Sequence, residues 1–445
     1  MTTLIISIVT FSMILAIVMG LLFKTTNLKR YNIFIYVSLF FFWIAMQIFK
    51  QNAGFIKGDL SKPWIWPLII SLYQFTQVAV RIPFGMLSSK FKSRKIVIQI
   101  SAVGFILTGI TLIASNFALW SIILTMMGAG MVGATFGLNS QYWSENWDIK
   151  KVFWSSVIMF TVPLLTSSLA NIIKQASNIN NELTPNGISL QGIRWIILTA
   201  LIIETIYVVI YTLVKERKET IGLDLGAPEE VIHTSKGYSM VWKLSITASL
   251  IAFMTMLVTN SAVMQNMGVG SSKTREELLA AIMILSILGA IITGTYLVKV
   301  FSILKIKGIS FITMIVAVLV GLVLALTNTR SAVAWGITTV VISVSAVIFQ
   351  VTLFGSTLHL DHKHPALVLG IFLSVRSFAL GSGELISREL IANIDNTKIA
   401  LSIVFGIATF VGGVSIIFHI INRIKMNTYY RTIQKYEFNF QEKKY

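Results

Sequence analysis

The sequence lacks cysteine and is poor in acidic residues. Its 445 residues contain 18 acidic and 36 basic side chains and no cysteine. Without cysteine, disulfides, thiolate metal sites and lipid attachment through cysteine are excluded. Charged residues make up only 12% of the chain against 55% hydrophobic residues, and the mean hydropathy is +0.79. This combination predicts an integral membrane protein.

The surplus of basic residues gives a formal net charge of +18 at pH 7. A basic soluble protein suggests nucleic acid, but nucleic-acid grooves are not built between apolar runs of about 20 residues. Membrane proteins instead concentrate lysine and arginine in their cytoplasmic connections. We therefore expect the lipid bilayer, and not nucleic acid, as a partner.

Thirteen apolar runs are long enough to cross about 30 Å of hydrocarbon as helices. They cover residues 4–23, 31–49, 64–87, 96–115, 118–139, 152–174, 194–214, 240–263, 277–299, 306–327, 332–356, 366–388 and 399–421. When the connection at 24–30 is cytoplasmic, that side collects 24 of the 36 basic residues and the other side 10. This asymmetry predicts a multi-pass plasma-membrane protein with its N-terminus outside and its C-terminus in the cytoplasm.

A charged connection divides the last twelve spans into two sets of six. Shifting the second set by 209 residues aligns Gly85 with Gly294 and Lys90 with Lys299. Parallel repeats of this kind occur in transporters that hold substrate between two bundles. The predicted organisation is an extra helix at 1–30, an N-terminal bundle at 31–214, a cytoplasmic loop at 215–239, a C-terminal bundle at 240–421, and an interfacial or disordered basic tail at 422–445.

The connection after the third span reads GMLSSKFKSRK and begins at Gly85. It resembles a loop motif of the major facilitator superfamily, which combines a glycine, an acid beside a basic residue, a second glycine and a closing basic pair. Gly85 matches the first glycine, Lys90 the first basic position, and Arg94 and Lys95 the closing pair. A serine and a lysine replace the acid and the second glycine.

The resemblance covers about residues 31–421 and implies an all-α membrane fold of two six-helix bundles, to which residues 1–30 add one helix. It also implies a secondary transporter that works by alternating access. In the superfamily the charges of this loop latch the cytoplasmic gate, whereas plain topological charge is the alternative explanation. The predicted gating residues are Gly85, Lys90, Arg94 and Lys95, with Glu145 and Asp148 as partners for Lys90.

Polar side chains in the third span mark a candidate transport path. Gln74, Gln77 and Arg81 stand at i, i+3 and i+7, so they share one face of a helix, which favours a wet cavity over lipid. Arg81 lies about two turns from the cytoplasmic end. An arginine that reaches the headgroups is therefore the alternative.

Arg376 lies at the centre of its span, where an arginine costs about 2.5 to 3.5 kcal/mol unless water, a partner or an anion is present. Glu384 is too far along the helix to neutralise it and is better placed to meet Arg388 at i+4. A structural arginine that caps carbonyls or pairs across helices is the alternative for Arg376.

In the superfamily, the helices that carry Arg81 and Arg376 border the central cavity from opposite sides. The resemblance therefore implies that Arg376 binds a carboxylate or similar anionic group, and that Arg81 attracts it on the cytoplasmic side. The further substrate-binding candidates are Gln77, Gln74 and Gln350.

Other features favour structural explanations. Ala129, Gly133 and Gly137 recur every four residues and predict a ridge for close helix packing. Glu204 stands in a helix that the superfamily places at the bundle periphery, so we expect packing rather than proton coupling. The segment HLDHKH at 359–364 matches no zinc-site spacing, and we expect a solvated loop.

The sequence thus predicts a monomeric secondary transporter for a small organic anion, with no metal or cofactor and with a coupling proton or ion as a candidate partner. A neutral solute such as a sugar or nucleoside is the alternative. A polytopic enzyme or scaffold is a third reading, but the sequence shows neither a Walker A motif nor an enzyme-like cluster of acids, histidines and a nucleophile.

Overall fold

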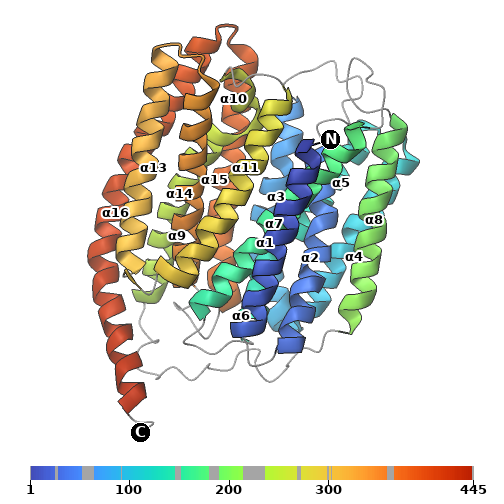
Figure 1. The fold of residues 1–445 in the computed structure, drawn as a ribbon. Helices are drawn as coiled ribbons and strands as arrows, with labels where there is room; N and C mark the ends of the chain where they lie inside the picture. Colours follow the sequence, from blue (N-terminus) through green and yellow to red (C-terminus); the bar gives the residue numbers. More distant parts are fainter. Residues whose placement is uncertain are drawn as a thin grey trace.

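The computed structural model describes residues 2–25, 29–52, 65–91, 93–145, 152–179, 190–213, 236–267, 272–297, 300–301, 303–357 and 365–442. Within these ranges the chain is built of helices that run nearly alongside one another (Figure 1). The all-helical architecture expected from the apolar runs is confirmed for this part of the chain.

The first seven spans comprise an extra helix and one set of six. In chain order their helices are α1 (Thr2–Thr25), α2 (Lys29–Asn52), α3 (Ile65–Lys90), α4 (Arg94–Ala114), α5 (Leu119–Ala134) continued by α6 (Phe136–Glu145), α7 (Val152–Ile179) and α8 (Leu190–Thr212).

The second set of six follows the central connection. Its helices are α9 (Lys236–Thr259) continued by α10 (Ser261–Asn266), α11 (Ser272–Ile292) continued by the π-turn η5 (Thr293–Leu297), α13 (Ile303–Leu326), α14 (Ala332–Thr357), α15 (Pro365–Asn393) and α16 (Thr397–Glu442).

Length and composition make most of these helices fit to cross a membrane. Eight spans in the described ranges have at least 18 residues with a strongly apolar window, and α1, α2, α7 and α11 each contain a shorter apolar stretch, at Ile8–Gly20, Ile35–Phe49, Val157–Ala170 and Ala281–Ile292. α3 belongs to neither group because its polar stripe lowers its hydropathy. It nevertheless has 26 residues, which is long enough to span at 1.5 Å per residue.

Two local signals interrupt the expected spans. The backbone N–H of Thr135 bonds back to the Val132 carbonyl at 3.1 Å and separates α5 from α6. The side chain of Asn260 accepts hydrogen bonds from the backbone of Ala262 and Val263 at 3.1 and 3.2 Å, and so caps α10. An asparagine N-cap of this kind starts a new helix where the apolar pattern alone would continue the old one.

The last helix is longer than expected. α16 has 46 residues and continues to Glu442, so the segment expected as an interfacial or disordered tail extends the last helix as far as that residue. This extension protrudes from one end of the bundle, which we call the tail face, while the chain begins near the other end, the opposite face (Figure 1). The two ends of the chain therefore lie on opposite faces.

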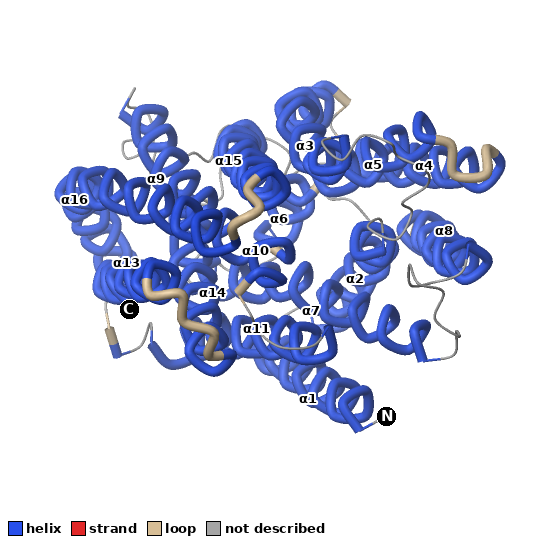
Figure 2. The backbone as a smooth tube through the Cα atoms, turned by 90° about the horizontal axis from the view of Figure 1, so that it is seen from above, coloured by secondary structure: helices blue, strands red, loops and turns tan. Residues whose placement is uncertain are grey.

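The two sets meet along a seam of a few helix pairs. Across the seam α3 packs on α15, and α7 packs on α11 and α14. α1 lies outside both sets and contacts α2 and α7 of the first set and α11 of the second (Figure 2). Ile14 and Val18 form its buried face, whereas Ile8, Val9 and Met13 are exposed as expected for a lipid-facing surface.

Candidate functional site

The polar stripe of α3 faces α15 across the seam. The Arg81 guanidinium is buried, and its Nη1 donates to the Leu373 carbonyl oxygen and to the Ser377 hydroxyl, the latter at 2.5 Å. Its Nη2 donates to Oε1 of Gln77. Arg81 therefore holds the two sets of helices together through neutral acceptors rather than extending toward headgroups.

Neighbouring amides extend this network along α3. The Gln77 Nε2 donates to Gln74 Oε1 at 3.4 Å, and the Ser377 hydroxyl lies 3.4 Å from Gln77 Oε1. The Tyr73 side chain is hydrogen-bonded to Gln77. The structure thus brings together three residues of the predicted stripe and adds Tyr73 and Ser377, which sequence reasoning missed.

Gly133 makes room for these groups. A Cβ at this position would stand 2.7 Å from the Tyr73 hydroxyl and 2.9 Å from Gln77 Nε2. Farther along the same face, a Cβ on Gly137 would meet Leu373 of α15 at 3.3 Å. The predicted small-residue ridge thus lets α5 and α6 lie close to the polar network and to the seam.

Arg376 forms the second part of the site. Its Nη2 donates to Oε1 of Gln350 on α14 at 2.5 Å, and its Nε is buried without a hydrogen-bond partner. The Nε of Arg81 is likewise buried and unpartnered. Each guanidinium therefore retains a buried donor, and an unmet buried donor costs about 1 to 3 kcal/mol.

The two arginines are close enough for their charges to interact, and Tyr73 lies within electrostatic range of both. In the described residues no carboxylate forms an ion pair with either guanidinium. Two like charges with no counter-charge in the described residues, one buried and one half-buried, create a positive potential. Such a site favours an anionic ligand.

An aromatic cluster lies on the tail-face side of this site. Phe136 of α6 and Phe160 of α7 face Phe354 of α14, with ring centroids 5.6 and 6.1 Å from that ring. Phe372 of α15 completes the cluster at 6.5 Å from Phe354. All four side chains are buried. We call these residues the aromatic plug; it joins both sets of helices.

The plug and the arginine site are neighbours along the helix axes. Phe372 precedes Arg376 by four residues on α15, and Gln350 precedes Phe354 by four residues on α14. One helical turn, about 6 Å, therefore separates the plug from the polar side chains. A ligand held by Arg376 would therefore rest close to the aromatic plug.

The basic loop lies at the tail face. Gly85 and Arg94 are buried and Lys90 is exposed. Lys95 Nζ donates to the Thr212 carbonyl at 2.5 Å, which ties the start of α4 to the end of α8. The expected partners of Lys90 are not tested, since Asp148 and the side chain of Glu145 lie outside the described residues.

Two acids inside the spans have different surroundings. Glu384 Oε1 pairs with Arg388 Nη2 at 3.0 Å, as the i+4 spacing predicts. Glu204 is fully buried, and neither of its carboxylate oxygens has a hydrogen-bond partner in the part of the chain that the structure describes. α8, which carries it, packs on α2 and α4 and so lies away from the seam.

The HLDHKH segment at 359–364 lies outside the described residues. Among the residues that are described, no group of three or more histidine, aspartate or glutamate side chains could hold a metal ion.

A family comparison decides the assignment. The model of the Major Facilitator Superfamily matches residues 31–384. The chain belongs to the Major Facilitator Superfamily. The resemblance drawn from the loop at Gly85 is thereby confirmed, and so is the assignment as a secondary transporter rather than an enzyme. Comparison with curated protein sequences finds no match.

Solved transporters share the fold. The human organic anion transporter MFSD10 (TETRAN) has a TM-score of 0.69 at 13% identity, covering 88% of this chain and 99% of its own. The proton:xylose symporter XylE, solved with 6-bromo-6-deoxy-D-glucose, has a TM-score of 0.66 at 11% identity, covering 86% and 95%. The E. coli transporter FucP in its outward conformation gives 0.62 at 14%, covering 87% and 97%. Identities this low show a common fold alone.

Proposed function

We propose that this superfamily member carries a small organic anion across the plasma membrane by alternating access, with Arg376 as the residue that binds its anionic group. The observation that carries the proposal is the pair of neighbouring arginines at the seam, Arg81 buried and Arg376 half-buried, each with a buried Nε that has no partner in the described residues and neither with a described carboxylate partner. A carboxylate would supply the missing counter-charge and accept these hydrogen bonds.

The contacts suggest different roles for the two arginines. Arg81 bonds to Leu373 and Ser377 across the seam, and these bonds must break when the two sets separate. Among the described residues Arg376 bonds only to Gln350, within the second set. An anion that attracts Arg81 would compete with its bonds across the seam. Substrate binding and opening of the path would then be coupled through Arg81.

The topology that we propose has the tail face in the cytoplasm and the N-terminus outside. The charge asymmetry of the connections supports this orientation. With this orientation, we propose that the aromatic plug closes the cytoplasmic side of the path in the described conformation. We further propose that the transporter works as a monomer, since each chain contains both halves of the site.

The test is uptake by proteoliposomes of labelled monocarboxylates, dicarboxylates, sugars and nucleosides, with and without a proton gradient. We expect a carboxylate to be transported, and a dependence of its uptake on the gradient would identify proton coupling. Arg376→Gln should weaken its apparent affinity about 10- to 150-fold, because a hydrogen bond to a charged group contributes about 1.5 to 3 kcal/mol. Arg376→Lys should also weaken it, because lysine lacks the planar fork.

The matched control is Arg194→Gln. Arg194 is exposed and bonds to Asn116, away from the seam. Wild-type affinity in both Arg376 variants would eliminate Arg376 as the binding residue. Uptake of a sugar or nucleoside, with no carboxylate transported, would favour the neutral-solute alternative, for which Gln74, Gln77 and Gln350 offer amide groups.

A further inference from the structure

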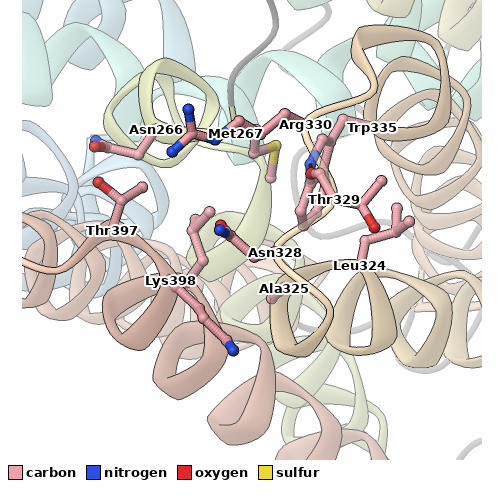
Figure 3. A pocket seen from close by; sticks show the side chains of 11 residues that line it. Asn266, Met267, Leu324, Ala325, Asn328, Thr329, Arg330, Trp335, Thr397 and Lys398 are labelled. Carbon is pink, nitrogen blue, oxygen red and sulfur yellow. Dashed lines mark hydrogen bonds between the residues drawn. The ribbon is translucent and has the colours of Figure 1, made fainter.

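A pocket on the opposite face lies within the second set of helices, away from the seam. It has a volume of about 270 Å³ and is formed by the end of α10, the α13–α14 connection and the start of α16 (Figure 3). The arginine site at the seam uses none of the residues that line it. We call this feature the outer pocket.

The apolar side of the outer pocket is held rigidly. Trp335 is buried, and its Nε1 donates to the Thr329 carbonyl at 2.8 Å while its ring packs on Phe405 with centroids 5.4 Å apart. Met267 and Leu401 beside it are also buried. Because these side chains are already ordered, an apolar ligand would bind without a large conformational cost.

The polar side carries positive charge. Arg330 has no hydrogen-bond or ion-pair partner among the described residues, and Figure 3 shows its guanidinium extending toward Asn266 and Thr397. Lys398 is the second basic residue of the lining, although its ammonium group points away from Arg330 (Figure 3). None of the described residues that line the pocket is acidic. The chemistry of the pocket is therefore that of an anion site beside an apolar wall.

We propose that the outer pocket binds a small carboxylate with one apolar ring or a branched chain, its carboxylate on Arg330 and its apolar part against Trp335 and Leu401. The pocket volume of about 270 Å³ lies just below the range of about 300 to 1,000 Å³ that is usual for ligand pockets. The pocket therefore suits a small ligand of this kind. A guanidinium with free donors binds a carboxylate through two parallel hydrogen bonds. This site is additional to the transport site proposed above.

The absence of cysteine makes a direct test possible. Thr397→Cys places a single thiol in the lining of the outer pocket, and its rate of modification by a membrane-impermeant maleimide can be measured in the purified full-length protein. Benzoate is the probe, and benzamide is its neutral counterpart of nearly the same shape. We expect saturating benzoate to slow modification at least three-fold and benzamide to leave the rate unchanged.

Two further variants assign the effect. Arg330→Gln in the Thr397→Cys background should abolish protection, while Arg330→Lys, which keeps the charge, should retain part of it. The control thiol is Asn393→Cys, an exposed position on the same face outside the lining. Benzoate should not alter its reactivity.

The outcome is separable from that of the transport site. If Arg376→Gln impairs uptake but leaves benzoate protection of Thr397→Cys intact, the two sites are independent as proposed. The proposal is overturned if benzamide protects equally well or if protection survives Arg330→Gln. It is also overturned if protection is lost in Arg376→Gln, because the thiol would then report a ligand bound at the seam.

Discussion

The aromatic plug offers the most direct test of the gating mechanism. Phe354 contacts Phe136 and Phe160 across the seam, whereas its contact with Phe372 stays within the second set. Only the two contacts across the seam are lost when the sets separate on the tail face. Phe354→Ala should therefore destabilise the described conformation relative to one that is open on that face.

The magnitude follows from the number of ring pairs across the seam. An aromatic pair contributes about 0.5 to 1.5 kcal/mol beyond its buried area, so two pairs amount to about 1 to 3 kcal/mol. Since 1.4 kcal/mol corresponds to a factor of ten, the equilibrium should shift toward the open state by about 5- to 150-fold. Phe354→Ala also loses ordinary packing within its own set, which the control must reproduce.

The assay uses Ser374→Cys as a single thiol in this cysteine-free chain. Ser374 is buried on α15 between Phe372 and Arg376. Its maleimide labelling rate should rise with the population of the open state. The matched control is Phe349→Ala. Phe349 lies on α14, as Phe354 does, but it is buried against Phe311 and His419 within the second set. Equal labelling in the Phe354→Ala and Phe349→Ala variants would refute the assignment of a gate.

Three other predictions address packing, charge and topology. Gly133→Ala should destabilise the protein by about 1 to 3 kcal/mol through overpacking against Tyr73. Its melting temperature should fall below that of Gly413→Ala, whose added Cβ meets nothing within 4 Å. Equal melting temperatures would contradict the close approach of Gly133 to Tyr73. Glu204→Gln should leave stability and uptake unchanged, because a neutral amide replaces a buried carboxyl that has no described partner. Loss of gradient-driven uptake in a folded variant would instead indicate that Glu204 takes part in proton coupling. Reporter tags at the two chain ends should be accessible from opposite sides of the membrane, and detection of both in the cytoplasm would disprove the proposed topology.

The sequence predicted the features that depend on spacing along a single helix. The i+4 pair of Glu384 and Arg388 and the shared face of Gln77 and Arg81 follow from 3.6 residues per turn, and both appear in the structure. The membrane spans were also predictable, because the rise per residue of a helix fixes how long an apolar run must be to cross the bilayer. Asn260 was a readable cap signal that the apolar pattern concealed.

Contacts between distant helices were not predictable in the same way. Phe136 and Phe354 are two of 28 phenylalanines, and an apolar ring in a span is equally compatible with lipid, with the interior of one bundle or with the seam. Which of these applies depends on how α6 and α14 are placed in space. The role of Tyr73 was missed for a similar reason, because its site exists only where Gly133 of another helix leaves room for the hydroxyl.

The position of α1 has a consequence for the order in which the protein is made. α1 leaves the ribosome before the other described helices, yet α11 begins roughly 250 residues later. At about 5 to 20 residues per second, synthesis of that stretch takes about 12 to 50 s. Throughout this time α1 can dock only on helices of the first set. The earliest of the described helices is therefore among the last to complete its contacts, and a chain that ends before α11 must leave part of the α1 surface against lipid.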